Sequence, residues 1–274
     1  MIASAHEEPV RAGLGPAFAA ARARLGLVAL LFVLAAVGWW WMVGEMQGMD
    51  GGPWTSLGAL SWFVGVWLVM MAAMMFPSVS PTVALYSKLT QSRAFGAPLV
   101  FTAGYLLTWT AVGVSAFVVA AAGGHVLGNV LSWDQAGRWI AASTLVVAAL
   151  YEVTPLKDVC LDKCRSPLGF LLGSWREGLS GALRMGARHG GWCVGCCWAL
   201  MASLFALGVM SIVWMAFVAG LIALEKTLPW RRAATWGTAA VLLLLGVLLL
   251  FAPDAIPALT TPDGSMSPMT PMSP

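Results

Sequence analysis

A histidine and three cysteines share one short segment of the chain, at His189, Cys193, Cys196 and Cys197. At about 100° per residue, an α-helix would place these four side chains within one arc of about 100°, provided that Gly190 and Gly191 do not break it. Thiolates and imidazole are ligands for soft and borderline metal ions. Cysteine also packs well as a small apolar residue, but three cysteines beside a histidine favour a metal site.

A second pair of cysteines, Cys160 and Cys164, precedes this segment. Their Cys-x3-Cys spacing is one helical turn, so both thiolates can contact one metal ion. A redox pair is the alternative, although thioredoxin-like motifs have the spacing Cys-x2-Cys. Thiols on the cytoplasmic side are kept reduced, which favours metal ligation over a structural disulfide. Cysteine and histidine also suit zinc, so a structural Zn²⁺ site is a further alternative.

Methionines that could bind a soft ion precede Pro77, at Met70, Met71, Met74 and Met75. They form two Met-x3-Met pairs, whose side chains stack along one side of a helix. Neutral thioethers select Cu(I) and bind it without losing a proton. A methionine-rich helix can instead be core packing, but the depth expected for this segment matches that of the cysteine cluster.

Two further groups of methionines are expected outside the membrane. One follows the first apolar run, at Met42, Met46 and Met49, and the other is in the C-terminal tail, at Met266, Met269 and Met272. The tail methionines repeat every third residue in a proline-rich segment, and polyproline II has three residues per turn, so their thioethers would share one edge. Alternatively, the regular spacing of the tail methionines arises by chance in a segment of low sequence complexity.

The chain that positions these residues is too apolar for a soluble domain. Of its 274 residues, 59% are hydrophobic and only 10% are charged, whereas soluble domains carry roughly 25% charged residues. The sequence therefore predicts an all-α fold, a polytopic transmembrane helical bundle of about seven spans. The expected spans are 25–42, 57–76, 98–122, 138–151, 192–210, 211–224 and 233–252. Spans five and six have almost no linker, so whether they are separate helices stays open.

The first run is read as a retained span, because it is longer than a signal-peptide core and ends in three tryptophans.

Lysine and arginine set the expected orientation, since they are retained on the cytoplasmic side. With the N-terminus inside, only Arg138 of the 15 Lys and Arg residues falls outside. We therefore expect a cytoplasmic leader (1–24), a transmembrane domain (25–252) with a cytoplasmic loop (152–190) that holds the Cys160 pair, and an external, disordered Met/Pro-rich tail (253–274).

Other function classes lack a motif in this chain. There is no Gly-rich phosphate loop, nucleophile elbow or His-Glu-x-x-His sequence. The basic residues lie in short loops between apolar runs, so the net charge of +3 does not indicate a nucleic-acid partner.

Three strings of the sequence resemble a known family. They are MMAAMMFPSVSP (70–81), TPLK with the following Cys-x3-Cys-Arg-Ser-Pro-Leu-Gly-Phe (154–170), and GARHGGWCVGCCWALM (186–201). Over roughly residues 25–250 the chain looks like the bacterial proteins described as predicted metal-binding integral membrane proteins, a largely uncharacterised family. Some members are associated with copper supply to oxidases of the tyrosinase and laccase kind. The resemblance marks the same cysteines, His189 and methionines of the second span as site residues.

The leading hypothesis is a copper-handling protein of the bacterial inner membrane, either a Cu(I) permease or a metallochaperone. Outer methionines would capture the ion, the methionines of the second span would pass it on, and the Cys/His cluster would hold it for a copper-dependent oxidase or a soluble acceptor. A thiol–disulfide redox protein and a structural zinc site are the alternatives. An enzyme activity is not expected.

Overall fold

The computed structural model describes residues 14–46, 59–90, 96–127, 137–207 and 211–252, and its regular structure is helical throughout these ranges. This confirms the all-α expectation. The helices are α1 (Leu14–Met46), α2 (Leu60–Thr90), α3 (Ala97–Leu127), α4 (Arg138–Glu152), α5 (Pro155–Arg165), α6 (Pro167–Ser174), α7 (Gly178–Leu207), α8 (Ile212–Thr227) and α9 (Arg231–Phe251).

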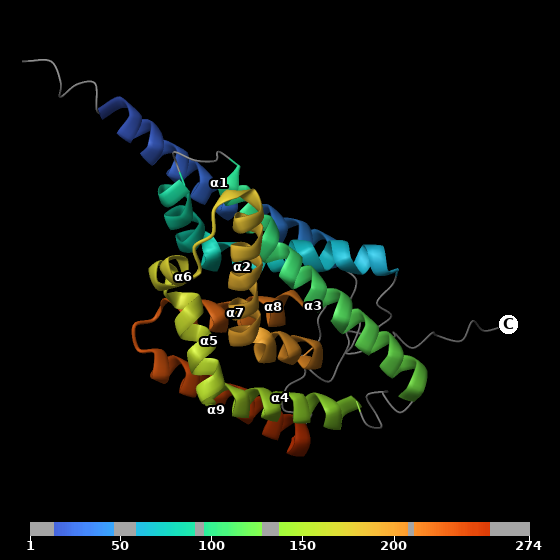
Figure 1. Cartoon of the computed structure of the whole chain (residues 1–274). Helices are drawn as coiled ribbons and strands as arrows, with labels where there is room; N and C mark the ends of the chain where they lie inside the picture. The colour runs from blue at the N-terminus through green and yellow to red at the C-terminus, as the bar shows by residue number, and fades with distance from the viewer. Residues whose placement is uncertain (1–13, 47–58, 91–95, 128–136, 208–210, 253–274) are drawn as a thin grey trace, which may run out of the picture.

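Helix α7 is the centre of the bundle. It packs against α3, α4, α5 and α8, while α1 packs on α2 and α4 packs on α9. Figure 1 shows the α1–α2 pair on one side of α7 and the α4–α9 pair on the other. The buried side chains of all these helices form one contiguous apolar core.

The outer surface of the bundle is also apolar. Large side chains such as Trp40, Val119 and Phe251 are more than two-thirds exposed. In water such a surface would cost free energy, but lipid solvates it. The long apolar helices therefore define a membrane-associated protein.

The number of helices fit to span a membrane is smaller than the sequence predicts. Among the described residues, four helical segments are long and apolar enough: Leu25–Glu45, Leu60–Thr90, Ala97–Gly123 and Arg231–Phe251. A fifth span is formed if α4 and α5, which bend by 69° at their junction, are counted as one. The expected spans at α4 and α8 are helices of only 15 and 16 residues, whereas a span needs about 20 residues. Helices α7 and α8 are separate, which answers the question that the sequence left open.

Proline and threonine cause the bend between α4 and α5. Pro155 has no N–H for the α4 ladder and instead occupies the first turn of α5, where none is needed. The Thr154 side chain caps α5 by accepting a hydrogen bond from the Lys157 N–H at 3.3 Å. The segment 152–190, expected as a loop, is thus made of α5, α6 and the start of α7.

Several expected features fall outside the described residues. These are residues 1–13 of the leader, Met49 and the tail 253–274 with Met266, Met269 and Met272; the side chain of Met46 is also outside the description. Helix α1 begins at Leu14, inside the expected leader.

Candidate metal centre

Helix α7 carries the His/Cys segment on one buried face. The helix continues through Gly190 and Gly191 without a break, which was the condition for the sequence prediction. The side chains of His189, Cys193, Cys196 and Cys197 are all at most 2% exposed. The four residues therefore share an inward-facing surface, as the helical spacing predicts.

Glycine brings α3 unusually close to this part of α7. A Cβ atom at Gly186 would overlap the backbone carbonyl of Phe101, and one at Gly104 would overlap that of Leu183. The Thr108 hydroxyl, on α3, donates a hydrogen bond to the carbonyl of Ala187 at 3.0 Å. The Gly186/Gly190 spacing predicts such an approach, because small residues let two backbones come together.

The close approach sets Tyr105 of α3 against the first cysteine of α7. The Tyr105 hydroxyl lies 3.1 Å from the Cys193 Sγ, and either atom can donate. Both side chains are fully buried. Tyr105 has no place in the sequence motifs, because only the packing of α3 on α7 makes it a neighbour of the thiol.

Helix α5 supplies the cysteine that completes a group of three thiols. The Sγ atoms of Cys164, Cys193 and Cys196 all lie within 4.8 Å of one another. Ligands held at about 2.3 Å from one metal ion lie about 4 Å apart, so only a small closure is needed to bind one. We call these three residues the thiol centre.

The other two cysteines border the thiol centre without belonging to it. The Cys197 Sγ is 4.0 Å from the Cys193 Sγ. Cys160 packs on the bare backbone of Gly195, where a Cβ atom would lie 2.7 Å from its sulfur. All five cysteines are free thiols. The sequence treats Cys160 and Cys164 as an equivalent pair, but α5 turns only Cys164 into the group.

His189 lies one turn before Cys193 and is surrounded by aromatic rings. The ring centroids of Phe170, Phe101 and Tyr105 are 4.8, 6.0 and 6.1 Å from that of the imidazole. Its Nδ1 atom is buried and has no hydrogen-bond partner. The imidazole is not one of the three residues whose ligand atoms converge, although it shares the buried face of α7 with the cysteines.

Lys226 is a site residue that sequence reasoning missed. Its Nζ donates hydrogen bonds to the Cys193 Sγ and to the Ser78 Oγ, each at 3.2 Å. The sequence assigns this lysine only to the cytoplasmic charge after the expected span 211–224, whereas the structure places it in the last turn of α8. No spacing signal connects it with the cysteines, because α8 reaches α7 through tertiary packing alone.

The methionines of α2 belong to the same core as the thiols. Met70, Met71, Met74 and Met75 are all buried. Ser78 follows on the same side of α2, and through Lys226 it is linked to Cys193. Met42 of α1 is fully buried as well, so it does not present its thioether at the surface.

The long apolar helices and the three converging thiols define the class of protein: an all-helical membrane protein with a buried cysteine cluster that could bind a metal ion. A family model described as "PpoB2: Copper chaperone" matches residues 64–249, more than half of the chain. The protein therefore belongs to the PpoB2 copper chaperone family. The match includes all five cysteines, His189 and the methionines of α2, and it confirms the copper-associated family that the sequence motifs resemble. No curated protein and no solved structure matched the chain.

Proposed function

We propose that this protein is a membrane metallochaperone that holds Cu(I) on the thiolates of Cys164, Cys193 and Cys196. The convergence of these three thiols in the core carries the proposal. They come from two helices, so the site exists only when α5 is packed on α7. Family membership supports copper as the cargo.

The donor set favours Cu(I) over a structural zinc ion. Thiolates suit both ions, but structural Zn²⁺ takes four protein ligands in a tetrahedron. In the described part of the chain, no fourth Cys, His, Asp or Glu side chain joins the three thiols at the same distances. Cu(I) accepts a smaller ligand set, and three sulfur atoms satisfy it.

The methionines of α2 would form the route to the thiol centre. Met71 and Met75 share a side of α2 with Ser78, which Lys226 links to Cys193. Thioethers bind Cu(I) without exchanging a proton, so they suit transient binding before transfer to thiolates. Cys160, Cys197 and His189 would line the centre, and Met46, Met49, Met266, Met269 and Met272 would capture the ion.

A multi-pass position in the bacterial inner membrane completes the proposal, with the leader 1–24 in the cytoplasm and the tail 253–274 outside. A copper-dependent oxidase or a soluble copper acceptor would receive the ion. Sealed vesicles separate a chaperone from a permease: a chaperone retains copper in proportion to protein, whereas a permease accumulates it inside the vesicles.

Serine substitutions test the thiol centre directly. The variants Cys164→Ser, Cys193→Ser and Cys196→Ser should each lose copper to a chromophoric Cu(I) chelator at concentrations that leave the wild type loaded, because each variant lacks one of the three thiolates that hold the ion. Binding would be measured on protein purified in detergent, with elemental analysis of the metal content.

Two comparison variants show whether the effect is specific to the three cysteines of the thiol centre. Cys197→Ser changes a neighbouring buried thiol outside the group and should keep the stoichiometry. Leucine at Met71 and Met75 should slow loading but leave the final copper content unchanged. Unchanged binding in all three centre variants would refute the thiol centre. An equal loss in Cys197→Ser would show that Cys197 belongs to the centre, contrary to the proposal.

A further inference from the structure

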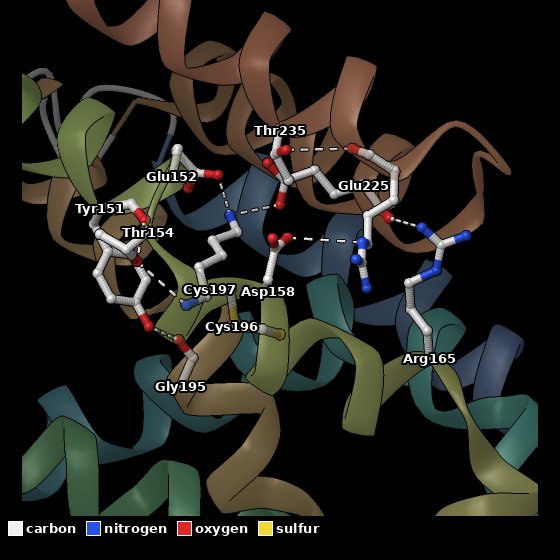
Figure 2. Close-up of polar contacts among 12 residues, drawn as sticks. Tyr151, Glu152, Thr154, Asp158, Arg165, Gly195, Cys196, Cys197, Glu225 and Thr235 are labelled. Atoms are coloured by element: carbon white, nitrogen blue, oxygen red, sulfur yellow. Dashed lines mark hydrogen bonds and ion pairs between the residues drawn. The ribbon is translucent and has the colours of Figure 1, made fainter.

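A second cluster of polar side chains lies in the core beside the thiol centre. It joins Glu152 at the end of α4, Lys157 of α5 and Glu225 of α8. The three side chains are 0%, 0% and 2% exposed. The Lys157 Nζ contacts the Oε2 atom of Glu152 and lies 2.7 Å from the Oε2 atom of Glu225. Figure 2 shows the carboxyl groups of Glu152 and Glu225 each joined by a dashed line to the same nitrogen.

The formal charges of this cluster do not balance. Two carboxylates and one ammonium leave one negative charge, and burying an unpaired charge is costly. The other charged groups on the neighbouring helices have different partners. The Arg165 guanidinium donates to the backbone carbonyls of Glu225 and Leu228, and Lys226 donates to Ser78 and Cys193.

The cations of α9 lie away from the cluster. Arg231 pairs with Asp158 and Asp162 near the surface, and Arg232 is exposed. Thr235 and Thr238, the buried polar side chains of α9, are neutral. Tyr151 of α4 donates its hydroxyl hydrogen to the carbonyl of Gly195. Within the described residues, therefore, the charge left over in the cluster has no second cation.

Each carboxyl group also keeps one oxygen without a partner. The Oε1 atoms of Glu152 and Glu225 are buried and accept no hydrogen bond. Because their Oε2 atoms contact one ammonium nitrogen, the two carboxyl groups are neighbours. A proton on either group would cancel the charge and leave a neutral acid beside a balanced ion pair.

We propose that Glu152 and Glu225 share one buried proton, which makes this cluster a proton-binding site separate from the thiol centre. A metal cation is the poorer occupant. Hard cations such as Ca²⁺ and Mg²⁺ need about six oxygen ligands, whereas the cluster offers two unpartnered oxygens, and the Lys157 ammonium repels a second cation.

The cluster lies on helices that also carry residues of the thiol centre or its neighbours. Lys157 and Cys164 are two turns apart on the same side of α5, and Glu225 precedes Lys226, which contacts Cys193. The contacts of Lys157 with Glu152 and Glu225 thus connect α5 to α4 and α8. A change in the charge of the cluster would therefore act on the helix that carries Cys164. This inference goes beyond the proposed copper function and does not depend on it.

The test compares the pH dependence of unfolding in wild type and two charge-matched variants without copper. Glutamate in an unfolded chain is ionised at neutral pH, so folding of the wild type would take up one proton. Stability then falls as the pH rises, and the folding equilibrium constant drops about tenfold per pH unit around neutrality. Glu152→Gln and Glu225→Gln each mimic the protonated acid, so each should fold and should show a slope one proton smaller.

Infrared spectroscopy provides the second measurement. The wild type should show the carbonyl band of a buried carboxylic acid at neutral pH, and either glutamine variant should lose it. Equal slopes in wild type and both variants, or no acid band in the wild type, would overturn the proposal. A wild-type slope that depends on sodium or calcium concentration would do the same, because it would identify a metal cation as the occupant. Copper binding is not read in either experiment, so the two proposals fail independently.

Discussion

At the scale of single residues, Cys193 is the best-connected thiol of the protein. Its Sγ contacts the Tyr105 hydroxyl and the Lys226 ammonium. Its backbone carbonyl accepts hydrogen bonds from the thiols of Cys196 and Cys197 at 3.1 and 2.8 Å. The hydrogen bond that Lys226 donates to the sulfur stabilises negative charge on it, and a metal-bound thiolate carries such charge.

Lys226 is the charged side chain that contacts Cys193 of this centre. A Cu(I) ion on three thiolates carries a net negative charge, which an adjacent ammonium offsets in a medium of low dielectric. Lys226→Met should therefore weaken Cu(I) binding about tenfold or more, which corresponds to about 1.4 kcal/mol or more. The dissociation constant would be measured by chelator competition on purified protein.

Two lysine variants control this prediction. Lys226→Arg keeps the positive charge and should retain most of the affinity. Lys163→Met removes the charge of an exposed lysine next to Cys164 and should leave the affinity unchanged. If Lys226→Met binds as tightly as wild type, the ammonium has no part in metal binding.

At the scale of elements, the contact of α3 with α7 holds the centre in place. It depends on Gly186 and Gly104, where the helix backbones touch. A methyl group at Gly186 would have to push α3 away, and with it Tyr105.

The variant Gly186→Ala tests this helix contact. Overpacking against a backbone atom costs about 1–3 kcal/mol, so the apparent melting temperature should fall by several degrees, together with the affinity for Cu(I). Gly191→Ala is the matched control, because nothing lies within 4 Å of a Cβ atom at Gly191. Similar melting temperatures for the two variants would contradict the role of Gly186.

The short helix α5 owes its direction to local sequence. Thr154 and Pro155 end α4 and begin α5 with a bend of 69°. Without that bend, Cys164 would continue along the α4 axis. The bend returns α5 to α7, where Cys160 packs on Gly195 and Cys164 joins the thiol centre.

At the scale of the whole molecule, the orientation can be argued with fewer spans than seven. If α4 with α5 is one span and α7 with α8 returns to the side from which it enters, five spans remain. The paired helices α7 and α8 add either two crossings or none, so both counts leave only Arg138 of the Lys and Arg residues outside. The charge rule thus predicts the same orientation for either number, and this prediction is still to be tested.

Reporter fusions test this topology. An enzyme reporter active only in the cytoplasm should work at the N-terminus and between α2 and α3, whereas one active only outside should work after residue 252. Fusions between α7 and α8 distinguish the counts: an external signal indicates seven spans, and a cytoplasmic signal indicates five. A cytoplasmic C-terminus would refute the orientation.

The sequence by itself determined the all-helical architecture, the membrane setting, the family and the inward face of α7. The architecture, the membrane setting and the inward face are local properties, because apolar run length and helical periodicity are encoded in consecutive residues, and the family is recognised from three short strings of the sequence. The same periodicity places the α2 methionines on a shared face, and all four are buried.

Only the tertiary structure decided which sulfur atoms meet. Cys164 joins Cys193 and Cys196, whereas Cys160, Cys197 and His189 remain beside the group. Lys226 and the buried Glu152–Lys157–Glu225 cluster carry no sequence signal as site residues, because their partners lie on other helices. The reason is physical: spacing along one helix specifies a face, but the partner of that face depends on how closely two backbones can approach.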